Sequence, residues 1–323
     1  MSLLMVNTKM YQIMLAGGKV WTLGAMDEAE AWLFALASAM RLPPCPVETP
    51  PDLLFILRHD ERLTAGELAA SLPAISSSRP SGKWRARVCP GVAFYSHPDV
   101  PHIVCCLTNG YGLRFPIEQM RRSLLPVFEG GLKRGGIPLH AALVARGGEA
   151  VLLTGKSGAG KSTSCRRLPQ TWEVLSDDMA LVVQITDGVY RVHPVPTWSA
   201  IEDFRICQSW AINRHVSLRA IFFLDQAARD EVFPLRRAEA AVGLYDASSV
   251  CFETMSGRFN SPEGLLYRKL VFANATSLAA TVPAYRLHVS LTGRFWEKIE
   301  EVLEKGTVPL FVQAGMKRND RNG

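Results

Sequence analysis

Short apolar runs and one amphipathic stretch define the first part of the chain. Apolar runs at residues 11–14 and 20–23 flank Gly17-Gly18, which predicts two strands joined by a turn. Residues 27–40 carry apolar side chains at helical spacing, which predicts a helix with one buried face. The same reasoning predicts further strands at 53–57, 92–96 and 103–108, a capping box at 64–67, an exposed loop at 75–82 and a helix at 117–128.

The second part of the chain is a series of short apolar runs separated by turn signals. Asp187-Gly188 lies between two such runs and is a strong hairpin signal. Consecutive hairpins predict a mixed sheet rather than an all-parallel one, and the fold class is therefore α/β. The predicted strands are 139–145, 150–153, 174–176, 179–185, 189–195 and 218–224, and the predicted helices are 162–168, 236–245 and 295–303.

These patterns divide the chain into three parts. We expect an N-terminal α+β region over residues 1–130, with a role in substrate recognition, and a nucleotide-binding domain over residues 131–305. Residues 306–323 look like a loose C-terminal tail. Gly130-Gly131 and Gly135-Gly136 predict a hinge-like connection at the boundary between the first two parts.

Composition and charge exclude several classes of protein. Apolar residues make up 48% of the 323 residues and charged residues 20%, as in globular proteins. The net charge of +6 is spread along the chain without a basic stripe, so we expect no nucleic-acid partner. No apolar run approaches the length of a membrane span and residues 1–10 do not resemble a signal peptide, so we expect a cytoplasmic protein without a membrane partner. The seven cysteines have no metal-ligand spacing.

One run carries most of the chemistry, because it fits G-x-x-x-x-G-K-[ST], the Walker A phosphate-binding loop. We expect ATP to bind at this loop, formed by Gly155, Lys156, Ser157, Gly158, Ala159, Gly160, Lys161, Ser162 and the following Thr163. Its glycines let successive amides point at phosphate oxygens, and the helix that follows adds the positive end of its dipole. Lys161 is expected to reach the β- and γ-phosphates, and the Ser162 hydroxyl to ligate Mg²⁺.

Two adjacent carboxylates follow the next predicted strand. Asp177 and Asp178 lie at its end, where an acid that holds Mg²⁺ belongs, and the second carboxylate could accept a proton from an attacking hydroxyl. Asp225, at the end of the strand over 218–224, is a rival metal ligand, and we prefer the Asp177-Asp178 pair. The sequence leaves open which of the two adjacent carboxylates is the base.

Two further features are candidates for the site. His140 lies fifteen residues before Gly155 on the preceding predicted strand, whose end we expect beside the γ-phosphate. Basic residues without an intervening acid form either a solvated loop edge or a landing strip for an acidic peptide or phosphate: Arg79, Lys83, Arg85 and Arg87.

Three strings of residues together resemble the HPr kinase/phosphorylase family, whose phosphate loop belongs to the phosphoenolpyruvate-carboxykinase-like group. The strings are Leu139-His140-Ala141-Ala142, Leu153 to Thr163 and Leu175-Ser176-Asp177-Asp178. Their order and spacing are similar to those of short HPr-kinase-like proteins from gene clusters for modified peptides, such as the SynChlorMet cassette protein ScmC. Pro196-Thr197-Trp198-Ser199 and the run from Tyr285 to Trp296 add to the resemblance, which covers residues 135–303.

The resemblance implies a P-loop kinase domain and a role for each matching residue. It implies that His140 is the active-site histidine, that Lys161 and Ser162 contact phosphate and metal, that Asp177 accepts the proton and that Asp178 is a metal-side acid. The chain lacks the glycine-rich signature of bifunctional HPr kinases, which would fall within residues 203–219. This departure points away from HPr as the acceptor and from reverse phosphorolysis.

These observations favour an ATP- and Mg²⁺-dependent kinase. It would transfer the γ-phosphoryl group to a Ser or Thr hydroxyl of a peptide or small protein, in the biosynthesis of a modified peptide. The alternative is a peptide-binding module that is regulated by nucleotide and transfers no phosphate. A different P-loop enzyme is the third reading, and the oligomeric state stays open, a homo-oligomer included.

Overall fold

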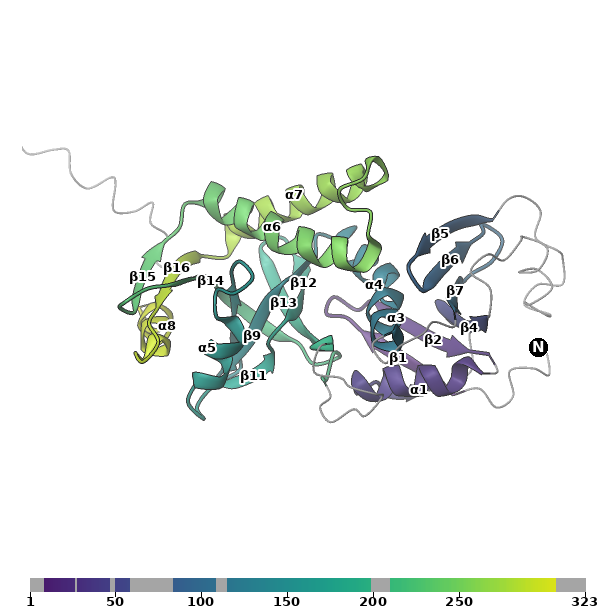
Figure 1. The fold of residues 1–323 in the computed structure, drawn as a ribbon, viewed down its shortest axis with the longest axis horizontal. Coiled ribbons are helices and arrows are strands. Elements are labelled where there is room, and N and C mark those ends of the chain that lie inside the picture. The colour runs from purple at the N-terminus through teal and green to yellow at the C-terminus, as the bar shows by residue number, and fades with distance from the viewer. Residues whose placement is uncertain are drawn as a thin grey trace, which may run out of the picture.

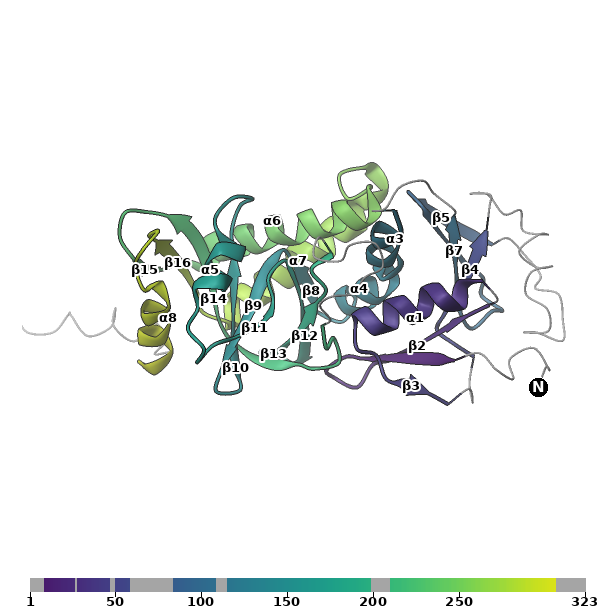
Figure 2. The same cartoon turned by 60° about the horizontal axis from the view of Figure 1, so that its bottom comes forward.

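Two mixed sheets lie side by side along the length of the molecule, with helices α3 and α4 between them in both views (Figures 1 and 2). The predicted α/β fold class is confirmed. The computed structural model describes residues 9–26, 28–46, 50–58, 84–108, 115–198 and 210–305. The expectations for residues 64–67, 75–82 and 306–323, and those for Arg79 and Lys83, lie outside the described residues.

The first sheet has the strand order β3-β1-β2-β4-β7-β6-β5. All five strands predicted here are present, and α1 (Ala29–Ala39) buries Trp32, Leu33 and Leu36 as its spacing predicted. The strands are β1 (Met10–Met14), β2 (Val20–Ala25), β3 (Pro44–Cys45), β4 (Leu53–Arg58), β5 (Arg85–Cys89), β6 (Val92–Ser96) and β7 (Ile103–Thr108).

The second sheet has the order β11-β9-β10-β14-β13-β12-β8, and β16 pairs with both β14 and β15. β10 runs parallel to β14 and antiparallel to β9, so the predicted mixed sheet is confirmed. The strands are β8 (Ile137–Leu139), β9 (Ala141–Arg146), β10 (Glu149–Thr154), β11 (Glu173–Ser176), β12 (Met179–Thr186), β13 (Val189–Val195), β14 (Val216–Gln226), β15 (Glu231–Pro234) and β16 (Ala284–Val289).

Residues 117–128, predicted as one helix, belong to two. α3 (Phe115–Ser123) ends before Leu124, and α4 (Leu125–Leu132) begins after it. Pro126 explains the break, because proline has no backbone N–H and fits only in the first turn of a helix. Of the two glycine pairs that bracket the predicted connection, Gly130-Gly131 lies inside α4, whereas Gly135-Gly136 lies between α4 and β8.

Helices cover both faces of the second sheet. α6 (Arg237–Ser256) and α7 (Leu265–Thr281) pack on the face that carries Leu143, Leu152 and Ile221, and they run along the sheet together (Figure 1). α5 (Lys161–Arg167) and α8 (Phe295–Glu304) pack on the opposite face. The predicted helix at 236–245 is longer than expected, and α7 was not predicted.

A single hydrophobic cluster connects the two sheets. It contains Ile13 and Phe55 of the first sheet, Phe128 of α4, and Leu143 and Leu181 of the second sheet, all essentially inaccessible to solvent. No helix within the described parts of the chain is both long enough and apolar enough to pass through a bilayer.

Candidate functional site

The phosphate loop lies between β10 and α5, the strand-to-helix context that its sequence predicts. Gly158 and Gly160 have φ angles of 81° and 95°, which side chains rarely adopt. Gly155 has φ 154°, and a Cβ added there would lie 3.0 Å from the carbonyl oxygen of Leu224 on β14. The backbone of this loop therefore requires glycine where the motif has it.

Lys161 is a buried cation within this loop. Its side-chain Nζ donates to the carbonyl oxygens of Gly155 at 3.0 Å and Lys156 at 3.4 Å, and it forms no ion pair within the described parts of the chain. Burial lowers the pKa of Lys161, and the charge of Asp178 acts in the opposite direction. A phosphate group would supply the negative charge that this ammonium lacks, so the loop fits the triphosphate of a nucleotide.

His140 interrupts the strand predicted at 139–145. The chain passes there from β8, which pairs with β12, to β9, which pairs with β10 and β11. The His140 N–H donates to the carbonyl of Ala247 on α6 at 3.1 Å, and its own carbonyl accepts from the Thr154 hydroxyl at 3.1 Å. Because Ala141 pairs with Thr154 in the antiparallel pair of β9 and β10, the start of β9, rather than its end, lies beside the phosphate loop, and His140 directly precedes that start.

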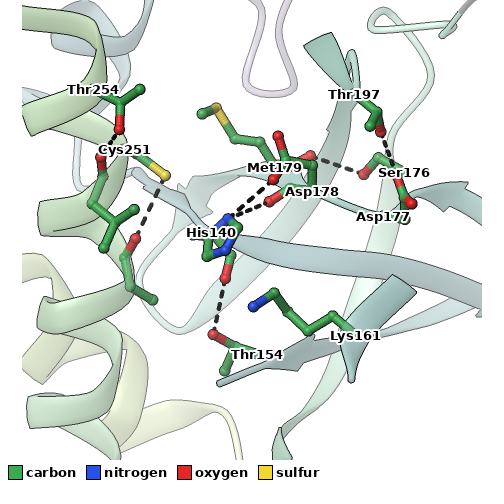
Figure 3. Close-up of polar contacts among 12 residues, drawn as sticks. His140, Thr154, Lys161, Ser176, Asp177, Asp178, Met179, Thr197, Cys251 and Thr254 are labelled. Carbon is green, nitrogen blue, oxygen red and sulfur yellow. Dashed lines mark hydrogen bonds and ion pairs between the residues drawn. The ribbon is translucent and has the colours of Figure 1, made fainter. Parts of the chain in front are cut away.

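Asp178 is the carboxylate next to His140 (Figure 3). His140 Nδ1 lies 2.9 Å from the Asp178 backbone oxygen and 3.2 Å from Asp178 Oδ1. A carbonyl oxygen only accepts, so Nδ1 carries the proton in this contact. Asp178 therefore contacts His140 directly, and its charge also acts on Lys161 of the phosphate loop.

Asp177 has a different partner. β11 ends at Ser176, so both carboxylates lie in the turn before β12 and are directed apart (Figure 3). The Thr197 hydroxyl donates to Asp177 Oδ1. The role of Thr197 is not predicted from the sequence, although β13 pairs with β12 at Val195 and Met179, which brings the residues that follow β13 beside this turn.

Asp225, the rival acid, lies at the same edge of the sheet, because β14 runs parallel to β10. Arg286 on β16 binds its carboxylate at 3.0 Å, and both side chains are about half exposed. Gln226, the next residue, donates to the Gly158 carbonyl at 2.8 Å. Asp225 therefore already has a cationic partner, whereas the charge of Asp178 acts on Lys161.

The residues predicted as metal ligands are Ser162 and Asp178. The described residues contain no group of three or more His, Cys, Asp or Glu side chains that could hold a metal by themselves. Mg²⁺ usually binds through one or two protein oxygens, substrate phosphates and water. One hydroxyl and one carboxylate beside a phosphate loop fit that pattern.

The predicted basic strip has a different outcome for each of its described members. Arg85 on β5 is exposed. Arg87 is engaged: its guanidinium pairs with Glu129 of α4 and donates to the Tyr267 hydroxyl of α7 at 2.8 Å. Arg87 thus links the first sheet to two helices, and neither of the two alternatives, a solvated loop edge or a landing strip, describes this residue.

The sequence over most of these elements matches a known family. The family model for SynChlorMet cassette protein ScmC matches residues 103–304, which is more than half of the chain. The chain belongs to the ScmC family. The matched part contains His140, the whole phosphate loop, both adjacent carboxylates and Thr197, whereas most of the first sheet precedes it. None of the curated proteins matches this ScmC-family chain.

Proposed function

We propose that this ScmC-family protein is an ATP-dependent kinase with an HPr-kinase-like P-loop domain. One observation carries the proposal: Lys161 is a buried ammonium in a phosphate loop and has no ion pair with a carboxylate among the described residues. Its charge interacts with that of Asp178, which contacts His140. Positioned charges of this kind are the main source of catalysis in phosphoryl transfer. The acceptor is a Ser or Thr hydroxyl of a peptide or small protein, and the family's cassette origin supports a peptide encoded nearby.

The residues take distinct parts in the reaction. The loop amides and Lys161 bind the phosphates. Mg²⁺, held by Ser162 and Asp178, would neutralise charge on the β- and γ-phosphate oxygens. Asp177, oriented by Thr197, accepts the proton of the acceptor hydroxyl.

Phosphoryl transfer requires only ATP, the acceptor hydroxyl and these groups of the protein. The acceptor oxygen forms a bond to the γ-phosphorus, and the bond from that phosphorus to the bridging oxygen of ADP breaks. The proton of the acceptor passes to the Asp177 carboxylate, and ADP leaves. His140 holds Asp178 through Nδ1, which keeps the metal-side carboxylate in place while charge moves.

The test is transfer from radiolabelled ATP to peptides encoded beside the gene, followed by mass spectrometry. Asp177→Asn keeps the shape of the side chain but is a far weaker proton acceptor, so it should bind Mg-ATP normally and transfer on the order of 10²–10⁴-fold more slowly. Asp187→Asn, at the exposed turn between β12 and β13, is the matched control and should match the parent. Transfer by Asp177→Asn near the parental rate would remove its role as base.

The alternative function is a nucleotide-regulated peptide-binding module. It predicts Mg-ATP binding by the parent protein, nucleotide-dependent capture of a peptide and no labelled product. Labelled peptide separates the two functions in one experiment.

A further inference from the structure

Arg121 on α3 is a largely buried cation that the proposed mechanism does not use. Its side chain is 16% exposed, and its one ion-pair partner within the described residues is Glu118 of the same helix. Its buried Nε has no hydrogen-bond partner in the part of the chain that the structure describes. Glu118 is shared, since Arg122 also lies 3.3 Å from its carboxylate.

The position of α3 brings Arg121 toward the candidate site. α3 packs against α6, and the fully buried thiol of Cys251 on α6 lies next to His140 (Figure 3). Burial raises the pKa of Cys251, Asp178 raises it further, and Arg121 and Lys161 lower it. Two cations and one carboxylate from three separate elements are therefore close enough to act on the same thiol.

The positive charge of Arg121 is only partly compensated by nearby carboxylates. Burial lowers its pKa, the charges of Glu118 and Asp178 only partly oppose this effect, and Arg122 adds to it. A cation in this state is stabilised by an anionic ligand, and the planar guanidinium matches phosphate oxygens in a two-point contact. Arg122 can keep Glu118 paired when Arg121 turns to such a ligand.

We propose that Arg121 is a further substrate-binding residue, whose guanidinium binds the phosphoryl group of the nucleotide during its transfer. The inference rests on the proposed kinase function. Through this contact, α3, which precedes the second sheet in the chain, would reach the phosphoryl group that is transferred. Lys161 and Arg121 would then neutralise the phosphoryl group from α5 and from α3 respectively.

Calorimetry with two defined probes, Mg-ADP and Mg-ADP with orthovanadate, tests this role without an acceptor. Orthovanadate imitates the phosphoryl group in transfer. Arg121→Gln should bind Mg-ADP like the parent and bind the vanadate complex about tenfold or more weakly, the loss expected for one charged hydrogen bond. Arg121→Lys should recover part of that affinity. Arg294→Gln, whose exposed guanidinium pairs with Glu297 three residues further along the chain, is the matched control and should bind both probes normally.

A second variant acts in the opposite direction. Glu118→Gln removes the carboxylate that occupies Arg121, so it should tighten binding of the vanadate complex, and it decides the matter if Arg121→Gln does not fold. Parental affinity of Arg121→Gln for the vanadate complex, or unchanged or weaker binding by Glu118→Gln, overturns the inference and leaves the kinase function standing. A parent protein that binds neither probe contradicts the kinase function itself.

Discussion

At the scale of single residues, two adjacent carboxylates have separate surroundings. Asp178 contacts His140, and its charge acts on Lys161, whereas Asp177 accepts a hydrogen bond from Thr197. Because they lie in a turn between strands, the two side chains are free to face different ways. This division is the physical basis for assigning one to the metal and the other to the proton.

Thr197 gives the first prediction. Thr197→Val keeps the volume of the side chain and removes the hydroxyl that orients Asp177, so phosphoryl transfer should slow about tenfold, the value of one hydrogen bond to a charged group, while Mg-ATP affinity stays unchanged. Steady-state transfer rates and calorimetry measure the two effects. Thr254→Val is the control, because the hydroxyl of this half-buried residue donates to the Val250 carbonyl of its own helix. Equal losses in the two variants would contradict an orienting role.

At the scale of elements, α4 contacts one sheet through Gly130 and the other through Gly131. A Cβ added at Gly130 would lie 2.6 Å from Trp21 Cζ2 of β2. A Cβ added at Gly131 would lie 3.6 Å from Leu181 Cδ1 of β12, which is an ordinary contact. Neighbouring positions of one short helix therefore differ in whether they admit a side chain.

The two alanine substitutions should have opposite effects on the free energy of unfolding. Gly130→Ala forces the Trp21 ring to move and should destabilise the protein by about 1–3 kcal/mol. Gly131→Ala gains helix propensity without a clash and should stabilise it by about 0.5–1 kcal/mol. Urea unfolding measures both, and destabilisation of equal size in the two variants would contradict the packing described for α4.

The sequence predicted strands better than it predicted helices or strand partners. Apolar runs between turn signals located the strands around the phosphate loop to within a few residues. α7 was missed because its apolar side chains occur on both its buried and its exposed faces. Val271 and Leu278 are buried, whereas Leu265, Leu266 and Phe272 are exposed, so the sequence of α7 shows no amphipathic period. The break at His140 was missed because apolar residues continue on both sides, and the change of partner depends on the whole sheet. The role of Thr197 was missed because its position beside Asp177 depends on the pairing of β12 with β13.

At the scale of the whole molecule, His193 on β13 joins the second sheet to the first. It is fully buried, its Nε2 accepts from the Ala16 N–H at 2.9 Å, and its Nδ1–H donates to the Ile212 carbonyl at 2.6 Å. Burial lowers its pKa to about 4, and the nearby His215 adds to the shift. Burial also lowers the pKa of His102 to about 4. Both rings are therefore neutral in the folded protein.

The protein should lose stability as the pH falls from about 6.5 toward 4. In that window the unfolded chain binds protons that the buried rings do not, so the free energy of the unfolded state falls relative to that of the folded state. His193 alone accounts for about 2 kcal/mol between pH 7 and 5. His193→Gln should reduce this pH dependence in urea unfolding at pH 7 and pH 5. His288→Gln, half-buried on β16, is the control. A pH dependence unchanged by His193→Gln would contradict a neutral His193 at this junction.

Binding of Mg-ATP tests the central claim most directly, because every proposed role depends on the phosphate loop. Calorimetry should show that the parent protein binds Mg-ATP and that Lys161→Ala, without its buried ammonium, binds at least about a hundredfold more weakly, as expected when a charged phosphate contact is lost. Lys269→Ala, which removes an exposed lysine of α7 outside the loop, is the control and should bind like the parent. Equal affinity of the parent and Lys161→Ala for Mg-ATP would contradict the account.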